Sequence, residues 1–265
     1  MKFVFGLLLC TITALSVCAE TKQELGRKII DQAVVALGGE NFLRVSDRVE
    51  NGRAYSFYRE RLTGLAKAKI YTQYVKPSEK KLGQRERQAF GKDEDVVTLF
   101  TEDAGYQITF RGAKPLESAR HSRYMDSTRR NIFYILRQRL NEPGLIFEHQ
   151  QSTIWSNVPV EVVSITDANN ETVTVYFQKS TNLPVRQVFY RRNPVDKERD
   201  EEVSIYSKYR DIGGGIHWPF NIMSERNGEK VFELYSDSVT VNQDLSSELF
   251  NLPGKMKVLR PDPAE

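Results

Sequence analysis

Residues 209–222 have the pattern of a tight hairpin between two strands. Three consecutive glycines at 213–215 permit positive φ without a Cβ clash, so the chain can reverse its direction there. Apolar and polar residues alternate on both sides, and this period of two predicts strands. Before the turn, the apolar residues at odd positions are Val203, Ile205 and Tyr209. After the turn, the apolar residues at even positions are Ile216, Trp218, Phe220 and Ile222. The sequence therefore predicts an antiparallel hairpin with one apolar face.

Alternations of the same kind recur over 53–111 and 158–234, separated by short turn-forming segments. Asn51-Gly52 predicts a turn before the first of these strands. Many antiparallel strands in one sheet twist and curl, which leaves a concave face that a helix or a ligand must fill. We therefore predict an α+β fold built on a curved antiparallel sheet.

Three segments have helical spacing instead. Residues 25–37 place apolar side chains at intervals of three and four, and Gly38-Gly39 predicts the end of that helix. A second helix is predicted over 116–140, and a short third one over 245–250, where Asp244 or Ser246 can cap it. The residues that line one side of the second helix are Met125, Ile132, Phe133, Leu136 and Leu140.

The first 19 residues have the charged start, apolar core and small-residue exit of a secretory signal peptide. We expect cleavage after Ala19 and a periplasmic location for the mature chain. The alternative is a lipoprotein signal with Cys18 as the acylated N-terminus. We expect 20–256 to form one domain and 257–265 to be a frayed tail.

Charge and cysteine content exclude several classes of function. The formal net charge is +3, and loss of Lys2 with the leader leaves +2, so charge does not predict a nucleic-acid partner. The two cysteines, Cys10 and Cys18, both lie in the leader, so the mature chain has no thiolate nucleophile or cysteine ligand.

Motifs for catalysis or metal binding are weak. Ser78-Glu79-Lys80-Lys81 matches S-x-x-K, but it follows a proline in charged surroundings and lacks a second catalytic element, so we interpret it as a solvated turn. The histidines have neither the paired spacing nor the HExxH pattern of a metal site. We therefore predict that the protein is not an enzyme, with no catalytic residue, no metal and no cofactor.

Three stretches carry a resemblance to the LolA/LolB-like superfamily of periplasmic lipid and lipoprotein carriers. They are Ala-Leu-Gly-Gly at 36–39, the hairpin at 209–222, and Leu-Ser-Ser-Glu-Leu-Phe-Asn-Leu-Pro at 245–253. The resemblance implies an incomplete, half-open β-barrel of about eleven strands with helices as lid or plug over an apolar cavity. It also implies a lipid or lipoprotein acyl chain as the ligand.

These expectations place a binding site on the concave face of the sheet. The residues expected to line it are Tyr209, Trp218, Phe220 and Ile222 on the wall, with Phe133 and Leu136 on the lid. Arg123, Arg130 and Arg137 on the basic helix are candidates for contact with a membrane surface or with lipid headgroups. The alternative for that helix is a core-packed segment with an ordinary solvated face. The alternative function is an envelope sensor or a protein-interaction module without a transported lipid.

Overall fold

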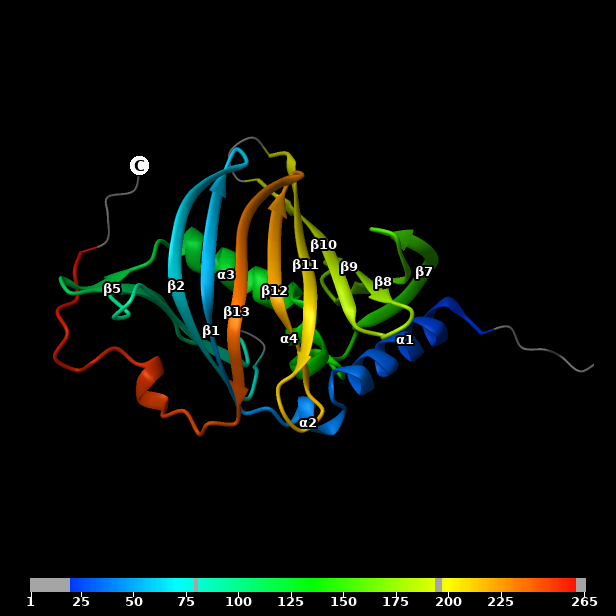
Figure 1. Ribbon diagram of the computed structural model, residues 1–265, viewed down its shortest axis with the longest axis horizontal. Helices are drawn as coiled ribbons and strands as arrows, with labels where there is room; N and C mark the ends of the chain where they lie inside the picture. Colours follow the sequence, from blue (N-terminus) through cyan, green and yellow to red (C-terminus); the bar gives the residue numbers. More distant parts are fainter. Residues whose placement is uncertain (1–19, 79–80, 194–196, 261–265) are drawn as a thin grey trace, which may run out of the picture.

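A single curved sheet of thirteen antiparallel strands dominates the part of the protein that the structure describes (Figure 1). The computed structural model describes residues 20–78, 81–193 and 197–260. The predicted signal peptide, residues 1–19, and the end of the predicted tail, residues 261–265, lie outside the described residues. The predicted cleavage site after Ala19 falls at the boundary.

The strands follow one another almost in chain order across the sheet. The order is β6-β5-β4-β3-β2-β1-β13-β12-β11-β10-β9-β8-β7, so β6 and β7 are the two edges and the barrel is incomplete. The strands are β1 (Asp47–Tyr58), β2 (Arg61–Tyr74), β3 (Gln84–Phe90), β4 (Val96–Phe100), β5 (Gly105–Thr109), β6 (Gly112–Pro115), β7 (Ile146–Trp155), β8 (Val158–Thr166), β9 (Thr172–Gln178), β10 (Pro184–Arg192), β11 (Arg199–Asp211), β12 (His217–Arg226) and β13 (Glu229–Val241). The predicted α+β class with a curved, half-open sheet is confirmed, with thirteen strands where the resemblance implied about eleven.

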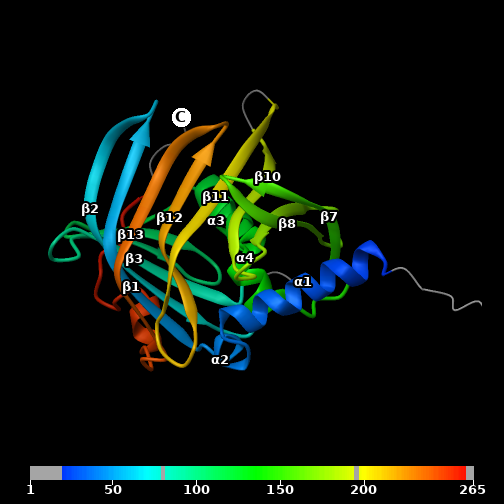
Figure 2. The same cartoon turned by 45° about the vertical axis from the view of Figure 1, so that its right-hand side comes forward.

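The first helix, α1 (Lys22–Leu37), ends where its sequence predicts and begins three residues before the predicted segment 25–37. Thr21 and Glu24 form a capping box at its start, and Gly38 ends it with φ of +124°. Its apolar side packs on β7 and β8, and Ile30 and Leu37 on that side are fully buried. The short α2 (Glu40–Leu43) follows at once and buries Phe42 in the same core. Figure 2 shows α1 and α2 along the lower edge of the strands.

The predicted helix over 116–140 is not continuous. It consists of α3 (Ser118–Arg130), the single turn α4 (Ile132–Tyr134) and the π-helical turn η1 (Ile135–Arg139). The break lies at Asn131, whose ψ of 128° is extended, and its side-chain oxygen accepts hydrogen bonds from the amides of Phe133 and Tyr134. We call residues 118–139 the helical plug, because α4 and η1 pack with α1 on the concave face of the sheet and α3 leads directly into them.

Each half of the sheet has its own apolar core. The larger core lies between the plug, α1 and strands β7 to β13. The smaller core lies on the opposite face of β1 to β5 and is covered by the C-terminal segment, in which the 3₁₀ turn η2 (Ser247–Phe250) buries Phe250. Ser246 caps η2, as predicted. Beyond it, Val258 pairs with Ala113 on edge strand β6.

Asn51 and Gly52 do not form a turn, so that prediction is wrong. They lie inside β1, where the register against β13 shifts between them. Gly52 is needed there because a Cβ atom would clash with the carbonyl oxygen of Tyr235 on β13. The sequence signal for a turn was instead a signal for a bulge with close backbone contact.

We expect Gly52→Ala to lower the free energy of unfolding by about 1–3 kcal/mol, because the β13 backbone must move to admit the methyl group. Gly64→Ala on the neighbouring β2 is the matched control. Its Cβ would lie 3.6 Å from the nearest atoms of Ser56, an ordinary contact, so we expect a change within about 0.5 kcal/mol. Urea denaturation of both variants measures the difference. Equal stabilities would contradict the close approach at Gly52.

The hairpin predicted at 209–222 is confirmed, but its apolar face changes parity. Asp211 pairs with His217, and Gly213, Gly214 and Gly215 all have positive φ. Lys208 also has positive φ, +57°, so Tyr206 and Tyr209 both pack on the core of the plug side. Ile205 therefore lies on the opposite face, contrary to the alternation expected from the sequence.

Candidate functional site

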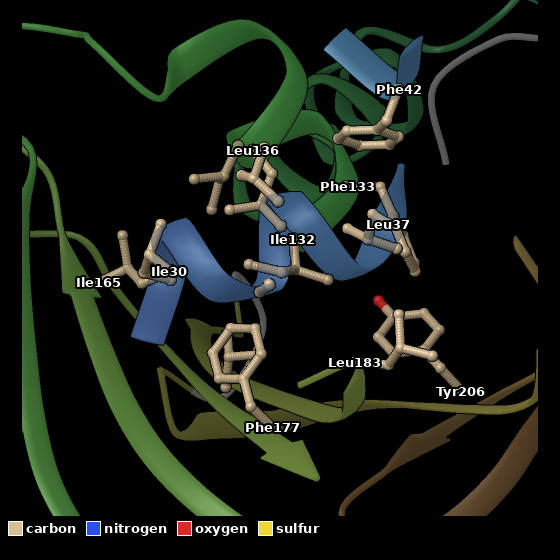
Figure 3. Packing of buried hydrophobic residues seen from close by; sticks show 14 of the residues in the cluster. Ile30, Leu37, Phe42, Ile132, Phe133, Leu136, Ile165, Phe177, Leu183 and Tyr206 are labelled. Atoms are coloured by element: carbon tan, nitrogen blue, oxygen red, sulfur yellow. The ribbon is translucent and has the colours of Figure 1, made fainter. Parts of the chain in front are cut away.

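The plug meets the hairpin of β11 and β12 through an aromatic cluster, of which Figure 3 labels Phe133 and Tyr206. The ring of Phe133 lies 4.6 Å from the ring of Trp218 and 4.9 Å from the ring of Tyr206, measured between centroids. Phe133, Leu136 and Trp218 are at most 5% exposed. The lid residues and the wall residues named from sequence are thus brought into one cluster.

The remaining wall residues border this cluster. Phe220 is buried within it, and Tyr209 and Ile222 are partly buried against it. The Tyr209 hydroxyl donates a hydrogen bond to the carbonyl oxygen of Pro184 at 2.6 Å, and burial raises the pKa of that phenol. Because these side chains pack against protein, the concave face is covered by the plug.

One side chain on the sheet fixes the break in the plug. The Gln187 side-chain oxygen accepts a hydrogen bond from the backbone amide of Ile132 at 2.9 Å and another from the Tyr206 hydroxyl at 2.8 Å. All three residues are buried. Sequence reasoning missed Gln187 and Tyr206 as site residues. Tyr206 lies outside the apolar parity of its strand, and Gln187 shares the parity of Val185 and Phe189 but is polar. Sequence reasoning also missed the Asn131 cap, although an asparagine before an apolar run is a helix-start signal.

The space beside Trp218 is nearly filled. A void of about 10 Å³ is lined by Phe42, Tyr74 and Trp218, among others, and is at the lower limit for one water molecule. The Arg48 guanidinium lies 4.0 Å from the Trp218 ring centroid. The indole N–H of Trp218 is buried and has no acceptor among the residues that the structure describes. A buried N–H without an acceptor beside a void marks an imperfectly packed part of the larger core.

The three arginines proposed for headgroup contact have different environments. Arg130 is 8% exposed and forms ion pairs with Asp126 at 2.6 Å and Glu171 at 2.7 Å, so its guanidinium holds α3 to the β8–β9 connection. Arg123 is half-buried on α3. Arg137 lies on η1 and donates to the carbonyl oxygen of Val45 from two nitrogens, at 3.0 and 3.3 Å.

An open pocket of about 690 Å³ lies beside η1. Its polar lining includes Lys81, Arg137, Arg139, Glu142 and Asp167, and its apolar lining includes Leu43, Leu82 and Leu140. Glu142 raises the pKa of Arg139, whereas burial lowers the pKa of Arg137. The π-helical geometry of η1 turns three successive polar side chains, at 137–139, toward this pocket, and such turns are frequent at functional sites.

The other polar groups are weaker candidates for a functional site. His149 and Ser152 hydrogen-bond the same Glu161 oxygen, at 2.8 and 2.7 Å, on the exposed side of β7 and β8. Within residues 20–78, 81–193 and 197–260, no three His, Cys, Asp or Glu side chains are grouped so that they could hold a metal ion. Over the same ranges, no helix is long and apolar enough to cross a bilayer.

No protein-family model matches the chain, and no curated protein matches its sequence. Solved structures match its fold. A DUF1329 family protein from Desulfovibrio piger superposes with a TM-score of 0.59 and 13% identity, covering 87% of this chain and 98% of that one. A candidate outer membrane lipoprotein-sorting protein domain from Vibrio parahaemolyticus gives 0.56 and 12%, covering 86% and 97%.

A LolA superfamily protein from Nitrosomonas europaea is similar to the same extent, with a TM-score of 0.54 and 14% identity over 85% of this chain and 97% of that one. Identities this low show a shared fold but not a shared function, since one fold hosts many functions. The thirteen-stranded open sheet and the helices on its concave face are thus a LolA/LolB-like fold.

Proposed function

We propose that the protein is a non-enzymatic envelope protein that binds a lipid or a lipoprotein acyl chain between the concave sheet and the helical plug. The observation that carries this proposal is the apolar wall around Trp218 and Phe220, which is covered by a broken helical segment instead of by another sheet. The likeness to a LolA superfamily protein and to a lipoprotein-sorting domain supports the same class of function.

Binding requires the plug to move, because the void beside Trp218 holds about 10 Å³. Each methylene transferred from water to the core contributes about 0.8 kcal/mol. An acyl chain that covers the same wall therefore restores the free energy of burial that is lost when Phe133 and Leu136 leave the cluster. The extended backbone at Asn131 gives the plug a point at which α4 and η1 can separate from α3.

The test is mass spectrometry of organic extracts from the mature protein, purified from a bacterial envelope without detergent. We expect a stoichiometric lipid with the natural protein and its loss in a folded Trp218→Asp or Phe133→Asp variant. Ile154→Asp is the matched control, because Ile154 is 72% exposed on β7 and distant from the plug core in sequence and packing. A natural protein that yields no lipid contradicts the proposal.

The second candidate is an envelope sensor or protein-interaction module. One observation favours it: the larger core is filled by the protein's own side chains. This function predicts a lipid-free protein whose Trp218 environment does not respond to added amphiphiles. The same extraction therefore separates the two functions.

A further inference from the structure

The pocket beside η1 contains a guanidinium without a carboxylate partner among the described residues. The two carboxylates in the lining, Glu142 and Asp167, both pair with Arg139, at 2.6 and 3.1 Å. Lys81 pairs with Asp103 at 2.7 Å. Arg137 is different, since its hydrogen bonds go to neutral acceptors, the Val45 carbonyl and the Gln138 side chain.

Arg137 is held in place for a further partner. Its bonds to Val45 and Gln138 use three of the five N–H groups of a guanidinium. Its carbon Cζ lies 5.1 Å from the ring centroid of Tyr74, which fixes the plane of the group. A planar, oriented guanidinium is the side chain best suited to bind carboxylate or phosphate oxygens in a forked arrangement.

The same arginine separates the pocket from the void beside Trp218. Arg137 lines both spaces, and α2 forms the rest of the wall, with Leu43 facing the pocket and Phe42 facing the void. α2 follows Gly38-Gly39, both with positive φ, and is only four residues long. Displacement of this turn would join the two spaces.

We propose that the pocket binds the anionic group of an amphiphile, held by Arg137, and that its chain passes α2 to reach Trp218. The proposal rests on the lipid-binding function and specifies its ligand as an anionic, chain-bearing molecule. Leu43, Leu82 and Leu140 in the lining favour an amphiphile over a free anion, because part of the wall is apolar.

The test uses the two tryptophans of the chain. In a Trp155→Phe background, emission comes from Trp218 alone. This protein is titrated with dodecyl phosphate, with dodecyl maltoside below its micellar concentration, and with inorganic phosphate. We expect dodecyl phosphate to shift the emission and to bind about tenfold more tightly than the maltoside. Inorganic phosphate alone leaves the emission unchanged and competes only weakly.

Arg137→Gln is expected to abolish this preference while maltoside binding persists, and Arg137→Lys, which keeps the charge but loses the fork, to retain part of it. Arg53→Gln is the matched control, because the Arg53 side chain is 58% exposed on β1 and lines neither space, and it leaves the preference intact. Thermal unfolding verifies that each variant is folded. Equal binding of the two amphiphiles, or an unchanged preference in Arg137→Gln, overturns the anion subsite alone. Binding of neither amphiphile overturns the lipid-binding function with it, and competition by phosphate at equal affinity shows a free-anion site instead.

Discussion

We expect Phe133→Ala to lower the free energy of unfolding by about 3–5 kcal/mol, the usual loss for removing a buried aromatic side chain. Phe133 is 3% exposed and contacts both Tyr206 and Trp218 through its ring. Its removal deletes the ring contacts between plug and hairpin and leaves a cavity beside Trp218, which also borders the void. Urea denaturation followed by circular dichroism measures this loss.

Phe110→Ala provides the control, since it makes the same change in side chain at a position that is 91% exposed. We expect it to alter stability by no more than about 0.5 kcal/mol. If Phe133→Ala costs as little as Phe110→Ala, the plug is not packed on the sheet in solution. A lowered m-value for Phe133→Ala would indicate that the plug detaches before the sheet unfolds.

We expect Gln187→Leu to lower the free energy of unfolding by about 2–4 kcal/mol, although leucine fills a similar volume. The variant loses the oxygen that accepts hydrogen bonds from the Ile132 amide and the Tyr206 hydroxyl. Two buried donors are then left unpaired, and each costs about 1–3 kcal/mol. Since Ile132 is the first residue after the break, we also expect faster amide hydrogen exchange in 132–139.

Tyr206→Phe removes only one of the two donors and leaves the hydrogen bond from the Ile132 amide in place. We therefore expect it to lower the free energy of unfolding by about 1 kcal/mol. In the double variant Gln187→Leu/Tyr206→Phe, the hydroxyl that would be left unpaired is absent. Its stability should therefore exceed the value obtained by adding the two single losses. Additive losses would show that Gln187 does not join these two groups.

Local pattern predicted the elements that depend on neighbours in sequence. The helix end at Gly38, the glycine turn at 213–215 and the Ser246 cap all follow from residues within four positions of one another. The half-open sheet followed from the number of alternating segments and from the family resemblance. Such features were predictable because backbone preference and side-chain period act over short distances.

Features that depend on distant residues were not predictable in this way. The plug breaks at Asn131 where Gln187, 55 positions away from Ile132, supplies an acceptor for the first amide of α4. The hairpin changes face because Lys208 takes a left-handed conformation, which few residues other than glycine and asparagine favour.

The arginines show the same division between local and long-range information. Sequence placed them all on one basic helix, but the fold gives Arg130 to Glu171 and Arg139 to Asp167, and leaves Arg137 with neutral acceptors among the described residues. An ion pair forms where two strands and a helix bring opposite charges within a few ångströms, and the sequence carries no record of that distance. Spacing along the chain identified the basic segment, whereas packing in three dimensions determined which guanidinium in the pocket has carboxylate partners and which has neutral acceptors.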